Sequence, residues 1–261
     1  MYYEILIFIF FGILSGILSG LLGIGGGFVT VPALYFIFRY TGMVEDWIMH
    51  ISVATSLAAV VFTALTACIV QYAKKTIHFS TIKLLIPGLV IGGIAGSIIG
   101  RELPGDLLRL VFGVIAILLG VYFCFPRLPF HISPSPNRSL SFCGLLIGVL
   151  SSLLGIGGGS LTFPVLLGYQ VPIKNASATS SAATFVTSLL GSVTYLIIAW
   201  HREQIPYTFG DIELPAFIAI STGAILATPF GVRLSHTLLA SHVKQIFGCT
   251  LALVGLSMLF L

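Results

Sequence analysis

The residues best suited to chemistry in this sequence are two glycine runs. The first comprises Gly23, Gly25, Gly26 and Gly27, and the second comprises Gly155, Gly157, Gly158 and Gly159. Glycine permits positive φ and leaves its amide N–H uncovered, and successive amides at the start of a helix form a positive nest. The predicted ligand is an anion, to which the hydroxyls of Thr30, Ser160 and Thr162 could also donate. Close packing of helices through small residues is the alternative interpretation.

Small polar and basic side chains recur in the segment that follows each glycine run. The first segment holds His50, Thr55 and Ser56, and the aligned second segment holds Lys174, Asn175, Thr179 and Ser180. Hydroxyls near a helix start can cap the helix or face a ligand, and His50 and Lys174 put a potential cation at equivalent positions. We expect these residues to line the anion site. Helix packing by small polar residues and snorkelling of Lys174 to the interface are the alternatives.

The positions of the acidic residues and the lack of enzyme motifs disfavour a cation site and a catalytic site. All eight acidic residues flank these stretches, whereas proton relays and sodium sites usually place carboxylates within them. A cation substrate is therefore disfavoured. The motifs H-E-x-x-H, G-x-x-x-x-G-K-[ST] and G-x-G-x-x-G are missing, so we expect no enzyme, no cofactor and no metal site. The four cysteines form no C-x-x-C pair and are interpreted as small apolar fillers.

The composition identifies the environment of these residues. The chain has 261 residues, of which 57% are hydrophobic and 8% are charged, against about 45–50% and about 25% in soluble domains. This excludes a soluble enzyme and a secreted disulfide scaffold and predicts an integral membrane protein. The net charge of +4 includes no basic block, so no nucleic-acid partner is expected. The N-terminal run MYYEILIFIFFG carries Glu4 and is interpreted as the first membrane element, not a cleaved signal.

Eight apolar stretches with little or no charge predict the membrane helices. They are 5–38, 51–73, 84–100, 110–126, 139–173, 176–200, 214–232 and 245–261. A single helix over 5–38 would be about 51 Å long, against a hydrocarbon core of about 30 Å. Both long stretches, 5–38 and 139–173, must therefore break, and both contain a glycine run.

The glycine runs belong to an internal repeat that covers the chain. The heptad LLGIGGG occurs twice, 132 residues apart, and Ala54–Ala59 aligns with Ala178–Ala183. We expect a first transmembrane repeat over 1–126, a proline-rich linker over 127–138 and a second transmembrane repeat over 139–261. Because irregular backbone survives in lipid only inside protein or along a polar cavity, two equivalent breaks predict a binding site between the repeats.

The distribution of lysine and arginine bears on the relative orientation of the repeats. Four crossings per repeat would put six of the twelve Lys and Arg residues on each side. A re-entrant broken element with three further crossings inverts the repeats and divides the same residues eight to four, which the positive-inside rule favours. The expected fold class is an all-α polytopic membrane protein of two inverted repeats. Each repeat has a glycine-broken, re-entrant helix element and three transmembrane helices.

The duplicated motif LLGIGGGxxxxPxL, each copy followed by an alanine-, serine- and threonine-rich helix, resembles the sulfite exporter TauE/SafE family. That family is also called the toluene sulfonate uptake permease family. The resemblance covers nearly the whole chain and extends the candidate site to Pro32 and Pro164. It implies a multi-pass transporter of the cytoplasmic membrane for sulfur-containing anions. The Lys-Asn-Ala run at Lys174 is typical of the family, whereas His50 at the equivalent position departs from it.

The expected function is a secondary transporter that exports small sulfur-containing anions such as sulfite or organosulfonates. The anion would be held by the glycine-rich backbone of both repeats, and the expected partners are this small anion and the lipid bilayer. An anion channel that uses the same nests as a filter is one alternative. A cysteine-dependent membrane sulfur-relay protein is another. The sequence sets neither the anion nor the oligomeric state.

Overall fold

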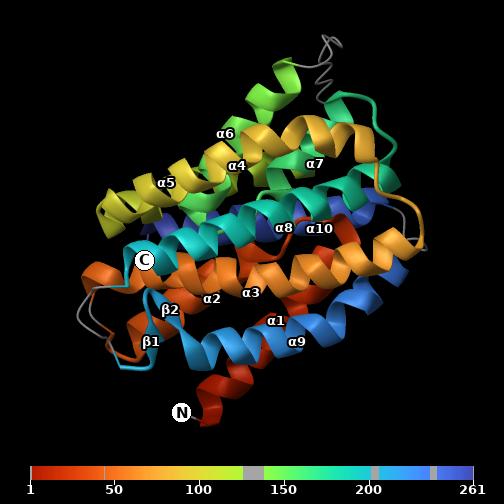
Figure 1. The fold of residues 1–261 in the computed structure, drawn as a ribbon. Coiled ribbons are helices and arrows are strands. Elements are labelled where there is room, and N and C mark those ends of the chain that lie inside the picture. The colour runs from red at the N-terminus through yellow and green to blue at the C-terminus, as the bar shows by residue number, and fades with distance from the viewer. Residues whose placement is uncertain (1, 44, 126–137, 201–205, 236–239, 261) are drawn as a thin grey trace.

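The protein is almost entirely helical. The computed structural model describes residues 2–43, 45–125, 138–200, 206–235 and 240–260. Within these ranges the helices are α1 (Tyr2–Leu22), α2 (Gly27–Tyr40), α3 (Glu45–Ala73), α4 (Phe79–Glu102), α5 (Gly105–Cys124), α6 (Arg138–Leu154), α7 (Gly159–Gly168), α8 (Ile173–Ile198), α9 (Leu214–Leu234) and α10 (Ala240–Phe260). A short hairpin of β1 (Thr208–Phe209) and β2 (Ile212–Glu213) precedes α9 (Figure 1). The expected linker falls outside the described residues, apart from Arg138.

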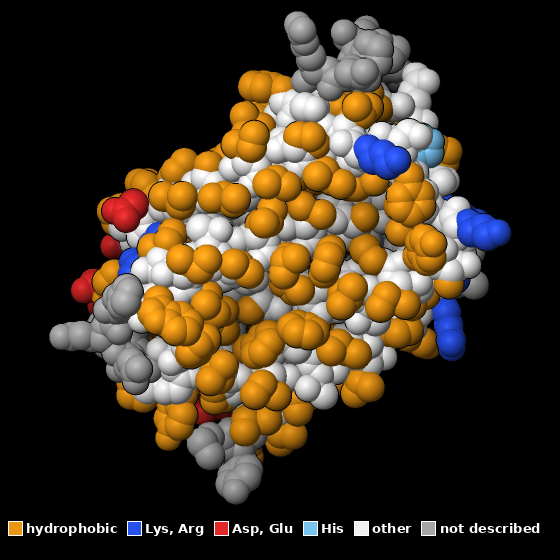
Figure 2. Space-filling view, viewed as in Figure 1, with side chains coloured by type: hydrophobic (Ala, Val, Ile, Leu, Met, Phe, Trp, Pro, Cys, Tyr) orange, Lys and Arg blue, Asp and Glu red, His pale blue; other side chains and the backbone are white. Residues whose placement is uncertain are grey.

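Most of the helices suit a membrane by length and composition. Among the described residues, six helices could each cross a bilayer: α1, α3, α4, α5, α8 and α9. Helices α2 and α7 and the described apolar parts of α6 and α10 are shorter. Hydrophobic side chains cover the broad middle of the face drawn in Figure 2. The chain is a multi-pass membrane protein, as its composition predicts.

Both long apolar stretches are interrupted at their glycine runs. Helix α1 ends at Leu22 and α2 begins at Gly27, while α6 ends at Leu154 and α7 begins at Gly159. The residues that cap the second helix of each pair, Gly26 and Gly158, have φ of 73° and 88°. This left-handed backbone is strained for residues with a Cβ atom. Glycine therefore determines where each helix stops and the next one begins.

The helices pack in pairs that join the two halves of the sequence. Helix α1 packs along α9, α4 along α6, α5 along α10, and α3 along α8. On α1, Gly12 and Gly16 lie against the backbone of Ile220 and Ala224 in α9. Gly144 of α6 lies in the same way against the backbone of Leu85 in α4. These glycines thus let helix backbones approach closely, as expected of small residues in membrane helices.

Helices α3 and α8 lie side by side through the middle of the molecule and run antiparallel (Figure 1). Near the C-terminus of α3, Gln71 Nε2 donates to Ser181 Oγ near the N-terminus of α8, at 3.2 Å. Just beyond α3, the carbonyl of Thr76 accepts from Asn175 Nδ2 in the first turn of α8, at 2.9 Å. The two helices that carry the aligned polar segments therefore point in opposite directions.

Charged side chains separate to the two ends of the molecule. Acidic side chains gather at one end of the visible face, and the most prominent lysine and arginine side chains gather at the other (Figure 2). Helix α3 begins with Glu45 and Asp46, and α4 ends with Glu102. We call this the acidic end. The opposite end carries Lys74 and Lys75 just after α3, Lys83 in α4 and Lys174 in α8, and we call it the basic end.

Candidate functional site at the helix breaks

The two helix breaks touch each other in the centre of the protein. A Cβ atom built on Gly27 would lie 2.5 Å from the carbonyl oxygen of Gly155 and from Cα of Ile156. A Cβ atom built on Gly159 would overlap the carbonyl oxygen of Gly23. All residues from 22 to 35 and from 151 to 160 are buried. The two breaks, 132 residues apart in sequence, thus form one buried cluster of irregular backbone.

Serine side chains tie each break to the other half of the chain. Ser56 Oγ in α3 donates to the carbonyl of Gly155 at 2.9 Å, and Ser180 Oγ in α8 donates to the carbonyl of Gly23 at 3.1 Å. Thr30 Oγ1 in α2 lies 2.6 Å from Ser56 Oγ. Three of the hydroxyls expected at the site therefore reach the breaks.

The first turns of α2 and α7 present their amides to the breaks. The carbonyl of Gly26 accepts from the amides of Val29 and Thr30, at 2.9 and 3.2 Å. The carbonyl of Gly158 accepts from the amide and from Oγ1 of Thr162, both at 2.9 Å. The first two amides of each helix, those of Gly27 and Phe28 in α2 and of Gly159 and Ser160 in α7, have no intrahelical acceptor, so each start carries positive partial charge. This is the electrostatic arrangement that suits an anion.

Prolines follow each helix start at the same position. Pro32 lies inside α2 and Pro164 lies inside α7. Since proline has no amide N–H, the carbonyls of Phe28 and Ser160 four residues earlier lose their usual intrahelical partners. The prolines therefore loosen the first turns of both helices.

Four buried hydroxyls near the breaks have no hydrogen-bond partner among the described residues: Ser15, Ser19, Ser151 and Ser160. Ser15 Oγ occupies the space that a Cβ atom on Gly26 would need, and Ser151 Oγ would lie 3.3 Å from a Cβ atom on Gly158. An unsatisfied buried hydroxyl costs about 1–3 kcal/mol. These groups can donate to a ligand without giving up an existing bond.

Of these four residues, only Ser160 is among the site residues expected from the sequence. A signal for two of the others is present in the repeat. Ser19 and Ser151 each precede the first glycine of their run, Gly23 or Gly155, by four residues. One helical turn therefore separates each serine from its break, and the carbonyl of Ser19 accepts from the amide of Gly23 at 2.7 Å.

Thr55 and Thr179 directly precede the two α3 and α8 serines that bond to the breaks, and they hold the two halves of the chain together. Thr55 Oγ1 in α3 accepts from the amide of Glu213, which precedes α9, at 2.9 Å. Thr179 Oγ1 in α8 accepts from the amide of His78, which precedes α4, at 3.0 Å. Both threonines were expected to line the anion site. Their hydroxyls instead anchor the start of a helix from the other half of the chain.

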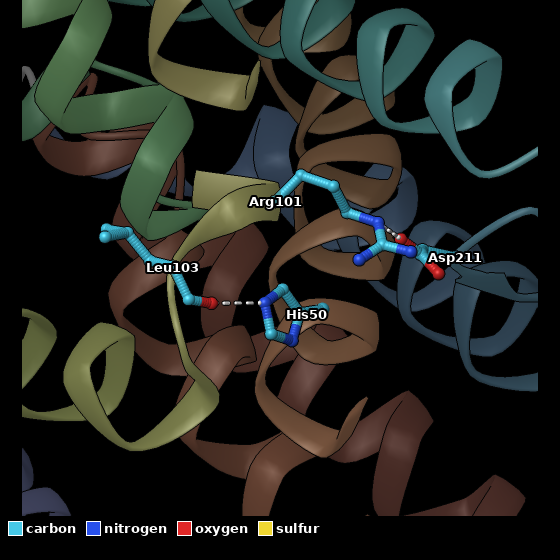
Figure 3. Close-up of polar contacts among 4 residues, drawn as sticks. All are labelled: His50, Arg101, Leu103 and Asp211. Carbon is cyan, nitrogen blue, oxygen red and sulfur yellow. Dashed lines mark hydrogen bonds and ion pairs between the residues drawn. The ribbon is translucent and has the colours of Figure 1, made fainter. Parts of the chain in front are cut away.

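The two expected cations lie at opposite ends of the protein. His50 is buried at the acidic end, where its Nε2 donates to the carbonyl of Leu103 at 2.9 Å (Figure 3). Lys174 is exposed at the basic end, beside Asn175. The structure thus brings neither cation to the breaks. The polar groups at the breaks are backbone amides and hydroxyls.

Glu213 is a buried acid at the start of α9. Its Oε2 accepts from the amide of Ala216 at 2.6 Å and caps the helix. Burial raises the pKa of its carboxyl group and the nearby carboxylate of Glu4 adds to the rise, whereas the hydrogen bond from Ala216 opposes it. Glu213 therefore holds its proton more tightly than an exposed glutamate does.

The described residues contain no group of three or more His, Cys, Asp or Glu side chains that could hold a metal ion. Of the four cysteines, Cys124 and Cys249 lie close together, with their sulfur atoms 3.6 Å apart. All four are free thiols.

Comparisons of the sequence with known proteins show which family the chain belongs to. The family described as sulfite exporter TauE/SafE matches residues 8–258. A probable membrane transporter protein of Methanocaldococcus jannaschii is 30% identical, covering 95% of this chain and 92% of its own. A probable membrane transporter protein of Haemophilus influenzae is 28% identical over 99% of both chains. Another, YunE of Bacillus subtilis, is 24% identical over 98% of both.

No solved structure matches the chain. The family match spans both glycine breaks, most of α1 and the other five helices that could cross a bilayer. The chain therefore belongs to the sulfite exporter TauE/SafE family and is a membrane transporter, not an enzyme.

Proposed function

We propose that the protein is a secondary transporter that exports small sulfur-containing oxyanions, such as sulfite or organosulfonates. The anion is held between the broken helices by the first-turn amides of α2 and α7 and by the hydroxyls around them. The observation that carries this proposal is the buried contact between Gly27 and Gly155, which joins both breaks into one cluster. The hydroxyls without a partner lie near two helix N-termini and can donate hydrogen bonds, and the oxygen atoms of an oxyanion can accept them.

We further propose that the two halves of the chain are inverted repeats, each with a re-entrant broken helix. At the basic end, Ser139 Oγ near the start of α6 lies 3.0 Å from the Tyr169 hydroxyl just beyond α7. At the acidic end, Glu4 near the start of α1 lies within electrostatic reach of Glu213, and Arg39 near the end of α2 shares a cavity with Glu45. Each broken element thus leaves and returns at one end, which supports re-entry from opposite sides.

The direction of transport is inferred from the separation of charge. The positive-inside rule places the basic end, with Lys74, Lys75, Lys83 and Lys174, in the cytoplasm. Its positive charge raises the local concentration of anions at the cytoplasmic mouth. This polarity supports export.

Anion efflux from proteoliposomes tests the proposal. Purified protein is first screened by thermal shift against sulfite, sulfate, thiosulfate, methanesulfonate and acetate, because a ligand that binds only the folded state raises its apparent stability. The stabilising anion is then loaded into vesicles, and its efflux is measured. We expect saturable efflux that is accelerated by the same anion outside. Unitary currents in a planar bilayer would identify a channel, and the absence of both flux and binding would refute the proposal.

The proximity of Cys124 and Cys249 favours one second candidate, a membrane sulfur-relay protein whose activity depends on its cysteine thiols. Its test is a variant in which all four cysteines are replaced by alanine or serine. A transporter built on backbone and hydroxyl contacts keeps its anion efflux in this variant. A sulfur relay loses its activity.

A further inference from the structure

A cavity of about 640 Å³ lies at the acidic end, away from the helix breaks. It forms where the C-termini of α2 and α4 meet the N-termini of α3 and α5. Its volume falls in the range of small-molecule sites, about 300–1,000 Å³. Tyr35 and Trp47 give it aromatic walls, and Ile48 and Met49 add apolar surface. A cavity of this size and lining suits an organic molecule better than a bare inorganic ion.

The charges of the cavity are arranged by depth. Four carboxylates at its rim, those of Glu45, Asp46, Glu102 and Asp106, are exposed and therefore screened by solvent. Two of the three arginines that line the cavity lie deeper, since the side chains of Arg101 and Arg109 are 13% and 23% exposed, whereas Arg39 is exposed. Arg109 is held loosely, 3.9 Å from Asp106 and 3.5 Å from the Tyr35 hydroxyl. A charged group that enters the cavity thus meets its strongest field from guanidinium groups.

Arg101 also connects the two halves of the chain. Its Nε lies 2.9 Å from Oδ2 of Asp211, in the turn between β1 and β2, and the Asp211 side chain is 1% exposed (Figure 3). The guanidinium carbon lies 4.3 Å from the centre of the Trp47 ring. One remaining guanidinium nitrogen points from this pair toward His50 (Figure 3). Arg101 therefore has donors on the cavity side while it holds the end of α4 to the β-hairpin.

We propose that this cavity is an outer anion site, and that Arg101 is shared between the bound anion and Asp211. The ligand is an organic sulfonate or a similar organic oxyanion, with its oxygen atoms at Arg101 and Arg109 and its apolar part against Trp47 and Tyr35. An anion that draws Arg101 away from Asp211 weakens the link between α4 and the hairpin. This inference rests on the proposed anion transport and adds a second binding place on the export route.

Tryptophan fluorescence isolates this cavity from the central breaks. The chain has two tryptophans, and Trp200 lies on Phe209 outside the cavity, with ring centroids 5.2 Å apart. Trp200→Phe therefore leaves Trp47 as the only reporter. Methanesulfonate is the probe, since it stays charged across the neutral pH range and absorbs little light. The titration is repeated with Gly26→Val added, which disables the central site but leaves the cavity intact.

The proposal makes predictions of opposite sign for the two members of the ion pair. Arg101→Gln should weaken methanesulfonate binding roughly tenfold, as expected when a charge-assisted hydrogen bond is lost. Asp211→Asn should strengthen binding several-fold, because it removes the internal competitor for Arg101. A purely structural ion pair predicts instead that both substitutions act in the same direction. That result would overturn the proposal.

Two further variants serve as controls for misfolding and for nonspecific effects of charge on binding. Arg109→Gln leaves the Arg101 pair intact and should weaken binding several-fold, whereas Lys83→Gln at the basic end should leave it unchanged. Wild-type affinity in Arg109→Gln, or no response of Trp47 to methanesulfonate, refutes the outer site. If Trp47 responds in the Gly26→Val background while central transport is lost, the two sites are distinct. If efflux persists without a Trp47 response, only the outer site is refuted.

Discussion

Ser56 of α3 donates a hydrogen bond to the carbonyl of Gly155, and the two residues are 99 positions apart in the sequence. Ser180, at the matching position of α8, makes the same kind of bond to Gly23. The irregular backbone of each break is thus satisfied by a side chain from the other half of the chain. Without such a partner, a carbonyl group at this depth would be costly.

Replacing Ser56 should therefore lower the stability of the protein. Ser56→Ala is expected to lower the free energy of unfolding by about 1–3 kcal/mol, because the Gly155 carbonyl loses its partner inside the protein. Ser257→Ala is a matched control, since Ser257 Oγ only bonds the carbonyl of Val254 within its own helix. Thermal unfolding in detergent measures the difference. Equal stability of the two variants would contradict a supporting role for Ser56.

The effect of crowding at the left-handed cap of α2 can be distinguished from the effect of backbone strain alone. Gly26→Ala is expected to reduce anion efflux roughly tenfold or more, because its Cβ atom meets Ser15 as well as a strained φ. Gly42 also has positive φ, at 76°, but an added Cβ would meet nothing within 4 Å. Gly42→Ala thus reports the strain alone and should keep most of the efflux. Ser15→Gly in the Gly26→Ala background should recover part of it.

The unpartnered hydroxyls should show opposite effects on stability and function. Ser19→Ala and Ser151→Ala each remove a buried hydroxyl that has no partner among the described residues. Thermal stability without ligand is expected to stay equal or to rise slightly, since no hydrogen bond is lost. Anion affinity, measured by the ligand-induced thermal shift, should fall several-fold. Unchanged affinity in both variants would remove these serines from the site.

Glu213 predicts a specific dependence of stability on pH. Its pKa is raised in the folded state above the ordinary value of 4.5. The folded state therefore binds the proton more tightly than the unfolded state does, and the contribution of Glu213 to stability falls as the pH rises from about 4.5 through the raised value. Glu213→Gln keeps an oxygen to cap Ala216 but does not ionise. We expect it to match the wild type near pH 4 and to unfold at a higher temperature near pH 7; the reverse order at pH 7 would contradict this.

Cysteine labelling tests the proposed inversion. In a background without native cysteines, Lys74→Cys follows α3 and Tyr207→Cys lies between α8 and α9, and both positions are exposed. Because α3 and α8 run antiparallel, a membrane-impermeant maleimide should label the two sites from opposite faces of intact cells or oriented vesicles. Labelling from the same face would exclude the inverted arrangement.

The sequence predicts those features of the fold that depend on local chemistry. Apolar length and missing charge identify the helices, and the excess length of 5–38 and 139–173 requires the breaks that occur at Gly23 and Gly155. The same local information predicts an anion as the ligand of the glycine amides, and this stays a prediction. Hydroxyls such as Ser56 and Thr30 reach the breaks because they lie on helices that pack against them.

The partners of individual side chains depend on contacts between segments far apart in the chain, and the sequence does not predict them. Thr55 and Ser56 are neighbours with similar side chains, yet one accepts from Glu213 and the other donates to Gly155. Only the packing of α3 against two other elements decides between these partners. The ion pair of Arg101 with Asp211 likewise depends on how α4 meets the β-hairpin, 110 residues later in the chain. Neither relationship follows from periodicity or composition.

The reciprocal threonine contacts have an evolutionary consequence. Thr55 secures the helix that begins after Glu213, and Thr179 secures the helix that begins after His78, so each half supplies what the other lacks. A polypeptide with only one half would leave its helix start and its glycine break without these partners. An ancestor of that length could have completed them by pairing with a second copy of itself in the opposite orientation. Under the proposed inversion, duplication and fusion of the gene for such an antiparallel homodimer would give the present chain.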